Sequence, residues 1–215
     1  MKIKDILQKS KISQEKIYFD EPMSKHTSFQ VGGLAECYIV ADTTEDIKEV
    51  LKIVNENKIS LTVLGKGTNV LVKDDGIKGI TLNIATKKIE INQEEKVVQL
   101  GAGNTISKVA QIAMKNNLSG LEELSGIPGT IGGAIRMNAG AHGKEIKDIV
   151  SEVIAIDYKG NIQKFTAEQC EFEYRNSIFS QKQYIILEAK IKLQKGEKQG
   201  IQKKMIEYAM WRKEK

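Results

Sequence analysis

The chain is organised around the stretch LSGIPGTIGGAIRMNAG, residues 124–140, which holds five glycines and one of the two prolines. Glycine admits positive φ and a close approach to the backbone, whereas proline stiffens the chain and lacks an N–H. This composition predicts either a loop pressed against a flat or anionic ligand, with free N–H groups, or a series of tight turns between two elements. Glycine content alone favours the turns, because short glycine patterns are weak evidence without structural context.

The bulk composition predicts an ordinary globular protein. Of the 215 residues, 40% are hydrophobic and 28% are charged, as in typical soluble domains. No apolar run approaches the roughly 20 residues that span a bilayer. The first residues, Met1 to Asp5, lack the apolar segment of a signal peptide. We therefore expect a cytoplasmic protein that does not bind a membrane.

The net charge of +5 is concentrated at the C-terminus. Residues 190–215 contain nine Lys or Arg against three Glu, an excess of six, which leaves 24 basic and 25 acidic residues elsewhere. A basic face for nucleic acid is therefore not indicated, and the tail is interpreted as a solvated basic helix. We expect no nucleic-acid partner, and the oligomeric state stays open.

The cysteines and histidines do not form a metal-ligand pattern. Cys37 and Cys170 lie far apart, outside any C-x-x-C pair, and are predicted to be buried thiols. His26 and His142 are too few for a histidine-based metal site, and no metal is expected. For His26, a ligand contact and a hydrogen-bonded structural role are both open.

Hydrophobic periodicity predicts a mixed α+β protein. A strand at residues 38–40, a helix at 43–57 capped by Thr43, and a strand at 61–64 suggest a βαβ unit with parallel pairing. The remaining pattern predicts strands at 79–84, 96–100, 149–156, 162–165 and 184–193, one helical turn at 166–171, and helices that begin at Thr105 and at Gln199.

Two further glycine turns follow predicted strands, at residues 65–69 and 101–105. Neither is a Rossmann fingerprint or a P-loop. The first precedes the apolar run 70–72 and is interpreted as a turn between strands, whose Gly67, Thr68 and Asn69 N–H groups could hold a pyrophosphate. Three such turns favour a phosphate-bearing cofactor over a plain scaffold, because an extended anion needs several close backbone approaches.

Four motifs in order make the chain similar to a known family. They are SKHTSF with VGG (residues 24–33), VLGKGTNVLV (63–72), GIPGTIGG with MNAGA (126–141), and YRNSIF (174–179). In sequence and spacing they resemble the UDP-N-acetylenolpyruvoylglucosamine reductases, and the resemblance covers nearly the whole chain. It implies a two-subdomain FAD-binding fold of the vanillyl-alcohol-oxidase (PCMH) type, with subdomains at residues 1–84 and 85–215.

The resemblance also implies the cofactor site. Gly65, Lys66, Gly67, Thr68 and Asn69 would hold the FAD pyrophosphate, and Ala102 and Gly103 would lie near the flavin. The flavin and ribityl wall would comprise Ser125, Gly126, Ile127, Pro128, Gly129, Thr130, Gly132, Gly133 and Asn138.

The reaction implied by the resemblance is NADPH-driven reduction of UDP-N-acetylglucosamine enolpyruvate to UDP-N-acetylmuramate, a step of cell-wall peptidoglycan synthesis. Hydride addition leaves negative charge beside a carboxylate, which a two-donor guanidinium can stabilise. Arg175 matches the family position for this role, and Tyr174 would lie beside the substrate. Considered without the resemblance, Arg175 is interpreted as a salt-bridge residue.

The chain also departs from the family pattern. Family members continue into a third domain with a proton-donating serine in a Gly-Ser-x-Phe segment and a late glutamate, whereas this sequence contains no Gly-Ser dipeptide. We therefore expect either the reductase or a FAD-binding module without independent catalysis. Lys66 replaces a small residue and His142 an aromatic one, Arg136 could face solvent or phosphate, and Tyr208 with Trp211 could form an exposed interface.

Overall fold

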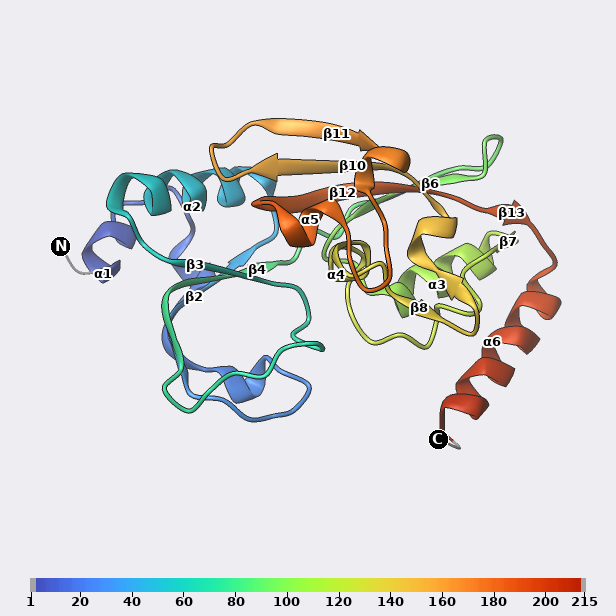
Figure 1. The fold of residues 1–215 in the computed structure, drawn as a ribbon, viewed down its shortest axis with the longest axis horizontal. Coiled ribbons are helices and arrows are strands. Elements are labelled where there is room, and N and C mark those ends of the chain that lie inside the picture. The colour runs from blue at the N-terminus through green and yellow to red at the C-terminus, as the bar shows by residue number, and fades with distance from the viewer. Residues whose placement is uncertain (1–2, 214–215) are drawn as a thin grey trace.

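The computed structural model describes residues 3–213, which form two main sheets joined by helices and loops (Figure 1). The four-stranded sheet has the order β1-β2-β4-β3, and the five-stranded sheet has the order β11-β10-β12-β6-β5. The strands are β1 (Ile17–Pro22), β2 (Leu34–Ala41), β3 (Leu61–Leu64), β4 (Ile77–Ile84), β5 (Ile89–Asn92), β6 (Val97–Gly101), β10 (Val150–Asp157), β11 (Ile162–Thr166) and β12 (Tyr184–Lys192).

The predicted βαβ unit is present, with one strand inserted. Helix α2 (Thr44–Asn57) begins with a capping box formed by Thr43 and Asp46, and its apolar residues Ile47, Val50, Leu51 and Val54 are buried. Strands β2 and β3 are parallel, but each pairs with β4, which lies between them. The expectation of direct pairing is therefore wrong, because a later strand occupies the central position.

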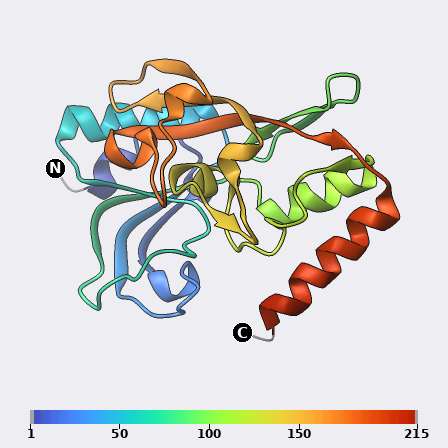
Figure 2. The ribbon, with the colours of Figure 1, turned by 45° about the vertical axis from the view of Figure 1, so that its right-hand side comes forward.

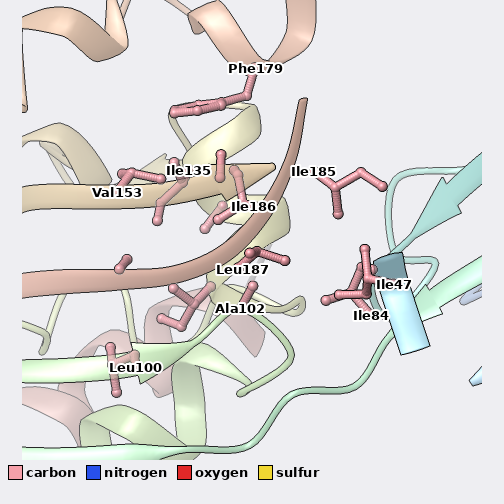
Figure 3. Packing of buried hydrophobic residues seen from close by; sticks show 14 of the residues in the cluster. Ile47, Ile84, Leu100, Ala102, Ile135, Val153, Phe179, Ile185, Ile186 and Leu187 are labelled. Atoms are coloured by element: carbon pink, nitrogen blue, oxygen red, sulfur yellow. The ribbon is translucent and has the colours of Figure 1, made fainter. Parts of the chain in front are cut away.

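The five-stranded sheet is antiparallel throughout, with β12 between β10 and β6. Its helices are α3 (Ile106–Lys115), capped by Thr105, α4 (Ile131–Arg136), and α5 (Ile178–Gln181). Ile135 of α4 packs beside Ile186 of β12, and Ile185 of β12 faces Ile47 and Ile84 (Figure 3). One apolar cluster therefore joins both sheets.

Short elements complete the fold. They are α1 (Ile3–Leu7), the 3-10 turns Gln14–Lys16, Met23–Lys25, Ile146–Asp148 and Glu168–Cys170, β7 (Leu118–Ser119) paired with β13 (Gln194–Lys195), β8 (Gly140–Ala141) paired with β9 (Lys144–Glu145), and α6 (Lys198–Lys213). Helix α6 extends away from the sheets in both ribbon views (Figures 1 and 2). Its Ile201 is buried, whereas Met210 and Trp211 are exposed.

Several local predictions need correction. Residues 65–76 form a long connection between parallel strands, so the run 70–72 is not a strand. Leu118 and Ser119 form β7 instead of closing a helix. Strands β1 and β5 were not expected at all. Residues 131–136, interpreted as loop, form the helix α4 because Thr130 supplies its N-cap.

The prediction of two buried thiols is confirmed. Both cysteines are buried, and burial raises the pKa of the Cys37 and Cys170 thiols to about 12. They therefore stay protonated at neutral pH. Within residues 3–213, no helix is long and apolar enough to cross a membrane, and no group of three potential metal-ligating side chains is found.

Candidate cofactor site

The turn at residues 65–69 follows the carboxyl end of β3 and exposes its backbone donors. Among the described residues, the N–H groups of Lys66, Gly67, Thr68 and Asn69 have no hydrogen-bond acceptor. Gly67 has φ +65°, and a Cβ there would lie 1.9 Å from the carbonyl oxygen of His26. Only glycine fits this position, and the turn leaves four donors for a ligand.

The glycine-rich stretch uses its donors differently. Ile131 N–H donates to the Asn104 carbonyl at 2.8 Å, and Gly132 N–H donates to the Ala102 carbonyl at 2.9 Å. Gly133 N–H donates to the Thr130 hydroxyl at 3.3 Å. The expectation of free N–H groups is therefore wrong for residues 131–133, where the glycines allow α4 to pack closely against the turn after β6.

The three glycine turns converge. The Thr68 hydroxyl donates to the Pro128 carbonyl at 3.1 Å. A Cβ on Gly65 would lie 2.4 Å from the Thr130 hydroxyl oxygen, and one on Gly132 would lie 3.0 Å from the Ala102 side chain. The stretches found separately along the sequence therefore form one close-packed surface.

Two cavities lie along this surface. The larger, of about 1040 Å³, is lined by the turn at 65–70, much of the stretch 127–142, Arg175, Trp211 and Arg212. The smaller, of about 510 Å³, is lined by Lys25, His26, Tyr38, Asn83, Lys87, Gly103 and neighbours. Both include Gly65, Lys66 and Thr130. The arrangement suits an elongated ligand with a narrow middle that crosses this shared boundary.

Both cavities are basic. The larger is lined by Lys66, Arg136, Arg175 and Arg212, and the smaller by Lys25, Lys66 and Lys87. No Asp or Glu among residues 3–213 lines either cavity. Such a field favours an anionic ligand.

The smaller cavity contains the histidine left open by the sequence. His26 Nε2 lies 2.9 Å from Glu21 Oε1, and its ring stacks on Tyr38 at 4.0 Å between centroids. His26 thus lines the cavity and is also held by structural contacts. Burial raises the pKa of Tyr38 to about 12, so its hydroxyl stays neutral.

Arg175 lies in a tight turn at the edge of the larger cavity. Glu173 and Asn176 exchange two backbone hydrogen bonds, and Arg175 between them has φ +55°. The hydrogen bond from Lys147 lowers the pKa of the nearby Glu145 carboxyl, and the positive charge of Arg175 acts in the same direction. The Glu145 carboxyl therefore lies close enough to Arg175 to feel its positive charge.

Six of the predicted site residues do not line either cavity: Ala102, Ser125, Gly126, Gly132, Asn138 and Tyr174. Ala102 is buried beneath Gly132, the Ser125 hydroxyl donates to the Glu122 carbonyl, and the Gly126 carbonyl accepts from Arg212. Tyr174 is 84% exposed. The other predicted residues line one or both cavities.

The structure adds Asn83 as a lining residue that the sequence did not indicate, and it shows how Arg136 and His142 are used. Asn83 precedes the last residue of β4 and lies beside Gly65, and its amide donates to the Gly65 carbonyl at 2.6 Å. The carboxyl ends of parallel strands meet at one edge of a sheet. The place of Asn83 beside Gly65 therefore follows from the pairing of β4 with β3, which local sequence patterns do not predict. Arg136 lines the larger cavity, and its guanidinium donates to the Phe179 carbonyl. His142 packs with Tyr208 and Trp211, and both His142 and Trp211 line the same cavity.

Comparison with known proteins identifies the family. A model described as FAD binding domain matches residues 35–166. The UDP-N-acetylenolpyruvoylglucosamine reductase of Caldanaerobacter subterraneus subsp. tengcongensis is 39% identical over 214 residues, covering 100% of this chain and 69% of that protein. The chain belongs to the UDP-N-acetylenolpyruvoylglucosamine reductase family.

Other family members agree with this assignment. The reductase of Clostridioides difficile is 44% identical over 200 residues, with coverage of 92% of this chain and 65% of the relative. The crystal structure of the reductase from Thermus caldophilus matches with a TM-score of 0.78 and 29% identity, covering 93% of this chain and 69% of that one. The chain thus spans about two thirds of the length of these reductases.

More distant structures share the fold alone. An alkyldihydroxyacetonephosphate synthase matches with a TM-score of 0.68 at 12% identity, covering 91% of this chain and 44% of that one. Together with the family assignment, this likeness confirms the predicted α+β FAD-binding fold of the vanillyl-alcohol-oxidase type.

Proposed function

We propose that this chain binds FAD across the two cavities and supports the NADPH-driven reduction of UDP-N-acetylglucosamine enolpyruvate in the cytoplasm, for peptidoglycan synthesis. The observation that carries the proposal is the shared boundary at Gly65, Lys66 and Thr130. At this boundary the free N–H groups of residues 66–69 lie next to the ammonium-bearing side chain of Lys66. Together they form the kind of donor set that binds a pyrophosphate.

The dimensions and chemistry of the site support FAD. Each cavity is large enough for one end of a dinucleotide, since ligand sites commonly measure roughly 300–1,000 Å³. Ile127, Pro128 and Ala134 give the larger cavity apolar walls for a flat ring system. Bound FAD would accept a hydride from NADPH and pass it to the substrate.

The chain's own residues would bind the substrate and stabilise the charge that forms on it. Reduction of the enolpyruvyl double bond places negative charge on the carbon beside the carboxylate. Arg175 would grip that carboxylate with two N–H donors and stabilise the charge. Exposed Tyr174, next in the same turn, would lie against the substrate from outside the cavity.

We also propose that the chain divides into subdomains at residues 1–84 and 85–215. The four-stranded sheet uses strands from Ile17 to Ile84, and the five-stranded sheet uses strands from Ile89 to Lys192. FAD would then lie between the two sheets, with its pyrophosphate on the turn that follows β3.

The test begins with reconstitution. Trp211 is the single tryptophan and lines the larger cavity, so its emission, together with flavin fluorescence, reports FAD titration. We expect stoichiometric binding, bleaching of the flavin by NADPH under anaerobic conditions, and recovery of colour on addition of the enolpyruvyl UDP-sugar. Failure to bind FAD would overturn the proposal.

A second candidate is a FAD-binding module that does not turn over alone. The chain spans 69% of the Caldanaerobacter relative and 65% of the Clostridioides relative, so turnover by this chain has to be measured directly. The last step of the same experiment, the addition of the enolpyruvyl UDP-sugar, distinguishes the two candidates. Tight FAD binding with no substrate-dependent recovery of the flavin colour would favour the module, and catalytic NADPH consumption would exclude it.

A further inference from the structure

Asn138 lies at the junction of three segments. It follows α4, has φ +40°, and is 1% exposed. Its side-chain amide donates to the Glu173 carbonyl at 2.9 Å, and its amide oxygen accepts from the Lys147 N–H at 3.3 Å. One buried side chain therefore connects the end of α4, the segment after β9, and the turn that carries Arg175.

The turn that Asn138 holds is strained. It spans Glu173 to Asn176, and Arg175 occupies its third position with φ +55°. Turns with positive φ at this position normally carry Gly or Asn. An arginine persists there only where the surroundings overdetermine the backbone, a pattern that concentrates at functional sites.

Each side of the turn has its own anchor. On the C-terminal side, buried Ser177 donates from its hydroxyl to the Arg136 carbonyl at 2.8 Å. On the N-terminal side, the side-chain contact to the turn's backbone comes from Asn138. The Glu173 carbonyl also accepts from the Asn176 N–H at 3.3 Å, so Asn138 binds the atom that closes the turn.

We infer that Asn138 is the positioning residue for Arg175, holding the turn so that the guanidinium reaches the larger cavity. Asn138 does not line that cavity, and both of its polar groups are used within the protein. Its effect therefore passes through the turn, in contrast to a direct cofactor contact. The functional part of this inference rests on the proposed role of Arg175 in binding the substrate carboxylate.

Asparagine suits the position because it combines three properties. Its planar amide offers a donor and an acceptor at once, and asparagine tolerates the left-handed backbone region better than most residues. Asn138→Asp keeps the size, the acceptor and the tolerance of positive φ. The ionised carboxylate, however, has no donor and places an oxygen against the Glu173 carbonyl.

The first measurement requires no activity. Amide hydrogen exchange at Glu173 and Asn176 is compared between the wild type and Asn138→Asp, with Asn116→Asp as control. Asn116 makes a matched pair of contacts far from Arg175, since its amide donates to the Ile112 carbonyl at 2.8 Å and its oxygen accepts from Gln93 at 3.0 Å. We expect exchange in the turn to accelerate about tenfold or more in Asn138→Asp only. Unchanged exchange would overturn the inference.

The second measurement uses the FAD-loaded protein. We expect Asn138→Asp to keep its FAD affinity within about twofold, and to bind the enolpyruvyl UDP-sugar about tenfold more weakly, as seen by perturbation of the flavin spectrum. The deficit should shrink as the pH falls and the introduced carboxyl regains a proton to donate. Equal losses of FAD and substrate affinity would contradict a positioning role.

The two measurements separate the two proposals. A wild-type chain that binds no FAD refutes the proposed function, while hydrogen exchange still decides whether Asn138 holds the turn. A wild-type chain that binds FAD and substrate, combined with an Asn138→Asp variant that binds both normally, refutes the positioning role alone.

Discussion

Two glycine-rich regions meet at this site, and they use their backbones in opposite ways. In residues 66–69 of the described chain, all four N–H groups lack a protein acceptor. In residues 131–133, all three N–H groups donate to other parts of the protein. One region is built to bind a ligand through its main chain, and the other is built to pack.

The difference shows what glycine does in each region. Gly67 makes room for the His26 carbonyl, lines the larger cavity, and has an N–H with no acceptor among the described residues. Gly132 makes room for the Ala102 side chain, with a hypothetical Cβ 3.0 Å away, and spends its N–H on the Ala102 carbonyl. Glycine content marks close approach in both cases, but only the hydrogen-bond inventory shows which region is left with free donors.

The strongest test of the ligand-binding region is Gly67→Ala. The new Cβ would overlap the His26 carbonyl oxygen at 1.9 Å, and alanine disfavours φ +65°. The turn must therefore rearrange, and we expect FAD affinity to fall about 100-fold or more, because several backbone donors move together. Titration of the apoprotein with FAD measures the loss.

Gly160→Ala is the control for backbone strain. Gly160 has φ +94°, and a Cβ there would meet nothing within 4 Å. This variant should lose stability without losing FAD affinity. If Gly67→Ala bound FAD as tightly as Gly160→Ala, the turn at 65–69 would not be the pyrophosphate site.

Lys66→Gln tests the charge that accompanies the free donors. Lys66 is exposed and lines both cavities at their boundary. Removing one cation near a pyrophosphate should weaken FAD binding about tenfold at low salt, and less at high salt because ions screen exposed charges. Riboflavin, which has no phosphate, should bind equally well to the wild type and to Lys66→Gln.

Lys164→Gln, which changes an exposed lysine of β11, is the matched control and should change neither the FAD affinity nor the riboflavin affinity. An equal loss for riboflavin would exclude a phosphate contact.

Thr130→Val tests the packing region. The valine keeps the shape but removes the hydroxyl that caps α4 by accepting from Gly133. We expect the free energy of unfolding to fall by about 1 kcal/mol. FAD affinity should change less than in Lys66→Gln, because the N–H groups of Ile131 and Gly132 stay bonded to the protein. Thr130→Ser should restore the stability. A larger effect on affinity than on stability would show that this region binds the ligand directly.

Much of this could be predicted from the sequence, for physical reasons. The capped amphipathic helix α2 and four strands of the five-stranded sheet, β6, β10, β11 and β12, follow from local periodicity, and the turn at 65–69 follows from its position after β3. The central place of β4 could not be predicted, because strand order is set by tertiary packing. Helix α4 was missed because glycine is a poor helix former, and its formation depends on Thr130 and on contacts with Ala102.

The site shows the same division. Motif positions identified Gly65 to Asn69 and Arg175, which line the larger cavity. They did not separate ligand contacts from supporting residues such as Asn138, since both occur in the same motif. Lys25 and Lys87 were missed because they come from segments that meet only in the folded chain, beside Tyr38 and Gly103 in the smaller cavity.

The smallest expected effect concerns the support beneath the ligand-binding turn. Glu21 accepts from His26, whose carbonyl packs on Gly67, and this contact lowers the pKa of the Glu21 carboxyl below its ordinary 4.5. A carboxyl with a depressed folded-state pKa stabilises the fold fully above its ordinary value, and the stabilisation disappears as the pH falls through the lower folded value. Glu21→Gln should therefore reduce the free energy of unfolding by about 1 kcal/mol or less at pH 7, with the difference from the wild type closing toward strong acid.

Denaturant titrations across this pH range measure the difference. A difference that widened toward acid would contradict a stabilising contact between Glu21 and His26. Because Glu21 itself lines neither cavity, FAD affinity at neutral pH should change less in this variant than in Lys66→Gln, as expected for a contact that supports the scaffold.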